Sequence, residues 1–106
     1  MSKGKGWRGR HQARTAAFKA LFALDARRGG DPQAALDHTL EETDVPAAEV
    51  PYAQRLVHGV MQAQEDLDAL IQASAPSWPV AQLARVDRTI LRLAVYELMH
   101  EPSVPR

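Results

Sequence analysis

The stretch LARVDRTILRLAVYELM, residues 83–99, decides the fold. A helix formed by it is apolar on nearly every side, whereas a surface helix carries one apolar stripe. Such a helix must be covered by neighbouring helices, so we expect it to be the central element of a small helical domain. Arg92 and Glu97 stand within its apolar run. Because a buried charge needs a partner, we favour ion pairs inside the protein for both over a place in an open groove.

The rest of the chain also carries helical periodicity. A first helix is expected from between residues 8 and 12 to about residue 28, where two glycines can take the left-handed conformation that ends helices. Asp31 and Pro32 indicate the start of a second helix over about residues 32–42. A third, long helix is expected over residues 51–73, a single turn over 80–84 and the central helix over 86–100. No segment alternates as a strand does, so the sequence predicts an all-α protein.

Two further features concern the organisation of the domain. A chain of 106 residues forms one domain at most. We expect residues 1–10 to be a basic disordered tail and residues 11–106 to be one helical domain. Pro102 and Pro105 rule out a simple continuation of the central helix. Gly59 lies inside the expected third helix, where glycine costs about 1 kcal/mol relative to alanine. We therefore expect a close helix crossing at Gly59.

Charge is divided unequally along the chain. Residues 1–28 hold eight basic side chains and one acidic one, a balance of +7, and the remaining residues have a balance of −7. A basic arm of this kind meets nucleic acid, phosphate or an acidic protein face, although a solvated tail gives the same pattern. Arg10 and Arg14 are one helical turn apart, so their guanidinium groups can project from one face. Arginine pairs with phosphate and stacks on bases, which suits single-stranded RNA.

Motifs for catalysis or for cofactors are missing from the sequence. It has no cysteine, no glycine-rich phosphate loop, no HExxH and no GxSxG, so we expect neither an enzyme nor a cofactor. His38, Glu41 and Glu42 have the spacing of metal ligands, but a solvated helix face produces that spacing by accident and we expect no metal site. No apolar run approaches the roughly 20 residues that span a bilayer, and no secretory signal is present. We expect a cytoplasmic protein that does not contact membranes.

The residues quoted above also resemble a known family. The segment SWPVAQLARVDRTILRLAVYEL, residues 77–98, is similar to the characteristic motif of the NusB transcription antitermination factors. Two more segments agree with that family in order and spacing: ARTAAFKALFALD at residues 13–25 and RLVHGVMQAQEDLDALI at residues 55–71. The resemblance implies a NusB-like helical bundle. Family members continue into two further helices, so about five helices are expected here and the last two are missing.

The resemblance also implies a function and a set of site residues. It implies an RNA-binding antitermination factor in rRNA transcription that recognises the boxA element of the transcript as a heterodimer with NusE, a ribosomal protein. The RNA polymerase elongation complex is then an indirect partner. The family's basic N-terminus contacts RNA, which makes candidates of Arg8, Arg10, His11 and Arg14. The positions that correspond to contacts with NusE are Phe22, Leu83 and Asp87.

Two alternatives to this function are kept open. One is the NusB-like RNA-binding module that precedes the catalytic domain of some rRNA cytosine methyltransferases. The other is a helical adaptor that binds only protein. Because the central helix has few neighbours in a shortened bundle, we also expect an apolar face that is covered by self-association, giving a homo-oligomer.

Overall fold

The computed structural model describes residues 2–77 and 79–100, with side chains from Arg8 onward. Its elements are α1 (Ser2–Arg27), α2 (Pro32–Glu42), η1 (Ala47–Glu49), α3 (Val50–Gln62), α4 (Gln64–Ser74), η2 (Val80–Gln82) and α5 (Arg85–His100), where η denotes a 3-10 turn. The described residues contain no strand, which confirms the predicted all-α class. None of the helices in these two ranges is long and apolar enough to cross a membrane. Trp78 of the quoted motif and the two prolines at 102 and 105 lie outside the described residues.

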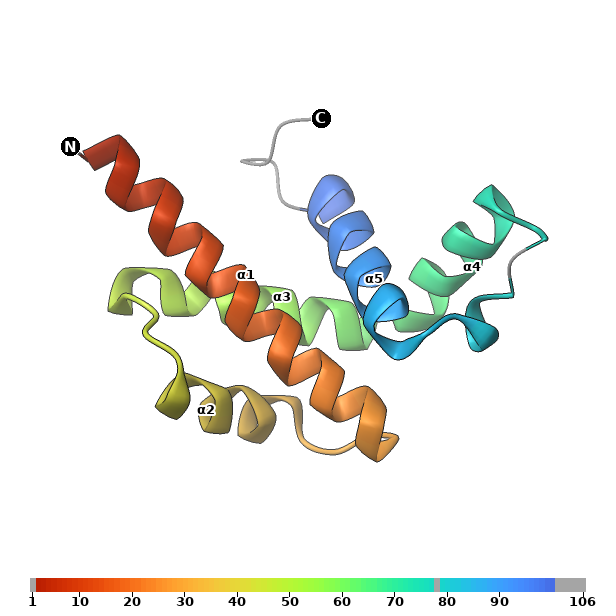
Figure 1. The fold of residues 1–106 in the computed structure, drawn as a ribbon, viewed down its shortest axis with the longest axis horizontal. Helices are drawn as coiled ribbons and strands as arrows, with labels where there is room; N and C mark the ends of the chain where they lie inside the picture. The colour runs from red at the N-terminus through yellow and green to blue at the C-terminus, as the bar shows by residue number, and fades with distance from the viewer. Residues whose placement is uncertain (1, 78, 101–106) are drawn as a thin grey trace.

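Helix α1 is the longest element and organises the bundle. It crosses the molecule diagonally, with α3 passing behind it, α2 at the lower left and α5 on the opposite side from α2, while α4 lies beyond α5 (Figure 1). Four buried alanines on α1 allow its neighbours to approach closely: Ala13, Ala16, Ala17 and Ala20. Most of the larger core side chains come from α1, α2 and α3: Leu21, Leu24, Leu36, Tyr52, Leu56, Val57 and Val60. Leu67 of α4 and Leu93 of α5 complete the cluster. The central helix of the bundle is therefore α1, not α5 as the sequence suggested.

The start of α1 differs from the expectation. The helix begins at Ser2, not between residues 8 and 12, so the segment that was expected to be a disordered tail is helical from residue 2 onward. Glycines at positions 4, 6 and 9 argue against a helix by local propensity. Tertiary contacts oppose that preference, because Gly9 is buried and a Cβ there would meet Glu49 and Pro46 at 3.0 and 3.4 Å. The start of α1 thus packs closely against Pro46 and Glu49, a contact that the glycine at position 9 permits.

The C-terminal end of α1 lies one residue before the predicted position. Arg28, with φ of 61°, is the residue that takes the left-handed conformation, and Gly29 and Gly30 follow with φ near 129° and 128°. The amide of Gly29 donates to the carbonyl of Leu24 at 2.9 Å and closes the last turn. The glycines therefore permit the reversal of the chain, but the helix itself ends on an arginine.

Helix α2 has the predicted bounds. The carboxylate of Asp31 accepts a hydrogen bond from the amide of Gln33 at 3.1 Å, and Pro32 occupies the first turn, as the start signal required. His38 and Glu42 on its outer face are 4.0 Å apart and largely exposed. In the part of the chain that the structure describes, no group of three or more histidine, cysteine or acidic residues could hold a metal ion.

The predicted third helix is two helices. Helix α3 ends at Gln62 and α4 begins at Gln64, with Ala63 at φ −98° and ψ 10° between them. Neither glycine nor proline marks this break, so the spacing of the apolar residues predicted one uninterrupted helix. The acidic pair Glu65 and Asp66 in the first turn of α4 suits the positive end of a helix dipole and was the available sequence signal. The change of direction lets α4 pack against α5.

Gly59 has the role that the sequence suggested. It faces α5, and a Cβ at this position would overlap the phenol ring of Tyr96. The close crossing of α3 and α5 therefore depends on the absence of a side chain at residue 59, which confirms the expected contact.

Helix α5 is buried in an unexpected orientation. Its inner face contains the polar residues Thr89, Arg92 and Glu97 together with Leu93. Its large apolar residues lie mainly on the outside and are between 37% and 49% exposed: Val86, Ile90, Leu91, Leu98 and Met99. The neighbours that the apolar sequence of α5 requires are therefore not supplied by α1 to α4.

Candidate functional site

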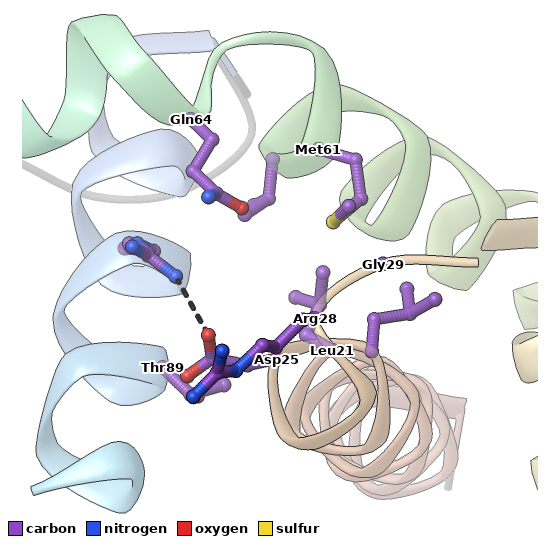
Figure 2. Close-up of a pocket in the computed structure, with 10 residues that line it drawn as sticks. Leu21, Asp25, Arg28, Gly29, Met61, Gln64 and Thr89 are labelled. Atoms are coloured by element: carbon purple, nitrogen blue, oxygen red, sulfur yellow. Dashed lines mark ion pairs between the residues drawn. The ribbon is translucent and has the colours of Figure 1, made fainter. Parts of the chain in front are cut away.

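The arginines of the quoted motif are held by carboxylates on other helices. Asp25, near the end of α1, accepts from Nη2 of Arg88 at 2.7 Å and lies within 4 Å of the guanidinium groups of Arg85 and Arg92. Figure 2 shows Asp25 in a pocket of about 300 Å³ that is lined by α1, α5 and the junction of α3 and α4, with its ion pair to Arg92 dashed. Arg88 also donates to the carbonyls of Ala81 and Leu83. These contacts fix the start of α5.

Arg92 has a second and closer partner. Its Nε and Nη2 donate to the two carboxylate oxygens of Asp68 on α4 at 2.7 and 2.8 Å. Two parallel hydrogen bonds between charged groups are the strongest arrangement that such a pair forms. The side chain of Arg92 is 9% exposed, so the expectation of an internal ion pair is confirmed for this residue.

Glu97 is paired as well, and its partner is a candidate RNA-binding residue. Nε of Arg14 on α1 donates to both carboxylate oxygens of Glu97, at 3.0 and 2.8 Å. The hydroxyl of the buried Tyr52 on α3 donates to the same carboxylate. Burial, together with this hydrogen bond, raises the pKa of Tyr52 to about 12. Glu97 thus joins α1, α3 and α5 at one point.

The four candidate RNA-binding residues lie along the first half of α1 but differ in their surroundings. Arg8 and His11 are exposed. Nε of Arg10 donates to Glu49 at 2.9 Å, and its guanidinium group lies 3.8 Å from the centre of the Tyr52 ring. The carboxylate of Glu49 raises the pKa of Arg10. Arg10 and Arg14 are therefore structural residues in part, which their spacing did not reveal.

A groove lies beside two of these candidates. Its volume is about 360 Å³, and it is lined by His11, Arg14, Thr15 and Phe18 of α1 and by Ile90, Leu93, Ala94 and Glu97 of α5. We call it the α1/α5 groove. Arg14 and His11 of α1 and the exposed apolar residues of α5 thus line one hollow.

The three candidate partner-binding residues surround the start of α5. Leu83 and Asp87 line a common hollow of about 380 Å³, and Asp87 is exposed. Phe22 is half-buried on α1, with the guanidinium group of Arg85 lying 5.9 Å from its ring centre. The structure brings Leu83 and Asp87 together, and it connects Phe22 to the same region through Arg85.

Sequence reasoning missed the carboxylates and the tyrosine that hold the arginines. The missed residues are Asp25, Glu49, Tyr52 and Asp68. The hydrogen bonds of Arg14 to Glu97 and of Arg88 to Asp25 join positions 83 and 63 residues apart. No local pattern reports such contacts, and the only available signal was the presence of charges within apolar helices.

Comparison with known proteins identifies the family. The NusB family model matches residues 11–106, which is most of the chain. The chain belongs to the NusB family. The transcription antitermination protein NusB of Carboxydothermus hydrogenoformans is 41% identical over 104 residues, covering 90% of this chain and 69% of the relative. That of Desulforamulus reducens is 36% identical over 98 residues, covering 92% and 68%.

Solved structures agree with the NusB assignment. The structure of T. maritima NusB superposes with a TM-score of 0.83 at 35% identity, covering 91% of this chain and 67% of the other. A chain in a structure titled "Crystal Structure of a Plectonemic RNA Supercoil" superposes with a TM-score of 0.82 at 31% identity. The predicted NusB-like bundle is thereby confirmed. The relatives are named as transcription antitermination proteins, so the chain is a member of a family of transcription factors.

Proposed function

We propose that this NusB family member binds single-stranded boxA-type RNA together with NusE during transcription of rRNA genes. The carrying observation is the position of its basic residues: Arg8 and His11 are exposed on the first half of α1, and Arg14 is held beside them by Glu97. Basic side chains that neutralise RNA phosphates release the counterions bound to the RNA, and this release supplies much of the affinity. Family membership favours this function over a protein-only adaptor.

The RNA-binding part of the proposal is tested best at Arg8. Arg10→Ala and Arg14→Ala would also remove the partners of Glu49 and Glu97, and their effects would mix folding with binding. Arg8→Ala is expected to weaken binding to a labelled boxA-type oligoribonucleotide and to lower the slope of log affinity against log salt by about 0.7, the value for one lost phosphate contact. Fluorescence anisotropy over a salt series, with NusE present, measures both.

The control for this test is Arg27→Ala. Arg27 is exposed at the other end of α1, so the change removes the same charge without touching the proposed interface. Equal losses for the two variants would show that only the net charge matters. A wild-type protein that ignores the oligoribonucleotide at low salt, even with NusE supplied, would refute the RNA-binding function.

The NusE part of the proposal rests on the region around Phe22, Leu83 and Asp87. Asp87→Lys is expected to weaken the complex with NusE at least about tenfold, because it reverses an exposed charge at the centre of that region. Titration calorimetry measures the affinity, and circular dichroism reports helix content. Asp66→Lys is the matched control, because Asp66 is an exposed acid in the first turn of α4. An unaltered affinity of the Asp87 variant would remove this surface from the proposed interface.

A further inference from the structure

One side chain of α4 holds the first half of the α4–α5 connection, residues 75–84 (Figure 1). Oε1 of Gln72 accepts a hydrogen bond from the amide of Val80 at 2.9 Å. Its Nε2 donates to the carbonyls of Ala75 and Pro76 at 3.4 and 3.1 Å. A side-chain amide is an acceptor and a donor at once, so one residue can bridge two backbone segments. Gln72 therefore joins the residues that follow α4 to the residue that opens the η2 turn.

The second half of the connection is held from α5. Nη1 of Arg88 donates to the carbonyls of Ala81 and Leu83 at 3.4 and 3.2 Å. Its Nε and Nη2 donate to Asp25 on α1, so a change at Arg88 would disturb α1 and α5 as well as the connection. Within the described structure, the side chain of Gln72 hydrogen-bonds only to the connection. The role of Gln72 can therefore be separated from the packing of the bundle.

Both side chains hold a segment that forms a hollow, although neither of them lines it. The hollow has a volume of about 380 Å³ and lies at the start of α5. Its lining residues are Ser77, Pro79, Gln82, Leu83 and Ala84 of the connection and Asp87 of α5. All but one of them belong to the connection. The shape of the hollow therefore depends on the conformation that Gln72 and Arg88 impose on the connection.

The hollow combines apolar side chains with one acid. Pro79 and Ala84 are exposed, and Leu83 is half-buried beside them. Asp87 is exposed, and its carboxylate forms no ion pair or hydrogen bond with the residues that the structure describes. Charge complementarity favours a partner that brings a basic group to such an acid. The hollow thus suits a protein segment in which an apolar side chain stands next to a lysine or an arginine.

A hollow that is already formed favours binding, because the chain that lines it does not have to be ordered when the partner arrives. We infer that Gln72 is a positioning residue for the partner: it fixes the connection in the conformation in which Leu83 and Asp87 receive an apolar side chain of NusE and the basic group beside it. The inference rests on the proposed contact with NusE. It adds a residue of α4 that acts on the partner only through the connection.

Gln72→Met tests the inference. Methionine keeps the length of the side chain and is a good helix former, but it removes the three hydrogen bonds to the connection. We expect the affinity for NusE to fall about tenfold in titration calorimetry, because the connection must then be ordered on binding. Hydrogen exchange at the Val80 amide, measured by NMR, should become faster. Gln72→Asn keeps the amide group but is one methylene shorter, and it should lower the affinity in the same way.

The matched control is Gln62→Met, because Gln62 is an exposed glutamine at the end of α3 and lies outside the connection. Its affinity for NusE is expected to stay within a factor of about two of the wild type. Circular dichroism should show the helix content of the wild type in all three variants. Faster exchange at Val80 without a loss of affinity for NusE would make Gln72 a structural residue only and would overturn the inference.

A double variant tests whether Gln72 acts through the hollow. In a Leu83→Ser background, Gln72→Met is expected to cost no more than about a further factor of two, because both changes act on one contact. A full tenfold loss in that background would overturn the inference. Wild-type protein that binds no NusE would refute the proposed function itself. A dimer of the protein alone that Leu83→Ser dissociates, with the affinity for NusE unchanged, would assign the hollow to a second copy of the chain.

Discussion

The bundle of α1, α2 and α3 and the helix α5 are held in place by opposite means. The first three helices bury apolar side chains, and Leu36, Leu56 and Val57 have no exposed surface. Helix α5 turns Thr89, Arg92 and Glu97 inward and leaves several of its large apolar residues in contact with solvent. Apolar burial is non-directional, whereas ion pairs and hydrogen bonds depend on geometry.

The difference shows how α5 obtains a fixed orientation with few neighbours. A smooth apolar contact would allow the helix to rotate about its axis. Asp25, Asp68 and Arg14 each bind a charged residue of α5, from α1 and α4, and thereby fix that rotation. The candidate RNA-binding residue Arg14 is one of these contacts, so the packing of α5 and the shape of the basic surface are set by the same side chains.

The largest expected effect is at Arg92. Arg92→Ala leaves Asp68 without its two hydrogen bonds, and we expect unfolding to become easier by about 2–3 kcal/mol, below the range for fully buried pairs because Asp68 keeps 29% of its side-chain surface. Urea unfolding followed by circular dichroism measures the change. Arg85→Ala is the control, since Arg85 is 45% exposed and 3.8 Å from Asp25, and a loss of no more than about 0.5 kcal/mol is expected. Similar losses for the two variants would contradict the role of buried pairing.

A smaller effect is expected at Tyr52. Tyr52→Phe keeps the ring beneath Arg10 but removes the hydrogen bond to Glu97, which should cost about 1–2 kcal/mol. The pH dependence gives a second test. The pKa of Tyr52 is raised from 10.0 to about 12 in the folded protein, so the unfolded chain loses this proton first.

The sign of the pH effect follows from that order. The contribution of Tyr52 to stability is complete below pH 10 and is lost as the pH rises to about 12, because between these values the folded state binds the proton more strongly. Wild-type protein should therefore lose stability over this interval, and the Phe variant should lose less. Tyrosinate absorbance and urea unfolding at each pH measure the two quantities. An identical alkaline decline in both proteins would exclude Tyr52 as its source.

The smallest effect is expected on the outer face of α5. Leu98→Gln should change the free energy of unfolding by less than about 0.5 kcal/mol, because the residue is 44% exposed in the folded chain. Binding of a fluorescent dye that reports apolar surface should fall. If the variant instead lost more than about 1 kcal/mol of unfolding free energy, roughly twice the expected limit, and the loss grew with protein concentration, a second copy of the chain would cover this face.

The sequence predicted the helices better than it predicted their contacts. Caps and breakers are local, so the bounds of α2 and the end of α1 near Gly29 were readable from adjacent residues. The break at Ala63 was not, because neither glycine nor proline marks it and the packing of α4 on α5 that goes with it is a contact between distant residues. The inward face of α5 was misjudged for a related reason: composition shows that charges and apolar residues coexist, but only partners on distant helices decide which side turns inward.

The candidate site divides in the same way. Residue type and helical spacing were enough to select Arg10 and Arg14 as basic residues with a role. The partners Glu49 and Glu97 are 39 and 83 residues distant in the chain, and only folding reveals that each arginine is shared between structure and surface. Arg8, which lacks such a partner in the described structure, is the cleaner probe of binding.

Gly59 is a position at which the protein should tolerate no substitution. Any side chain there must displace the ring of Tyr96, whose neighbour in the chain is Glu97, the residue that holds Arg14. In a library of random variants selected for growth, position 59 should accept glycine and reject even alanine, although it touches no ligand. The missing side chain at residue 59 of α3 thus sets how closely α5 can approach, and with it the position of the carboxylate that orients the guanidinium group of Arg14.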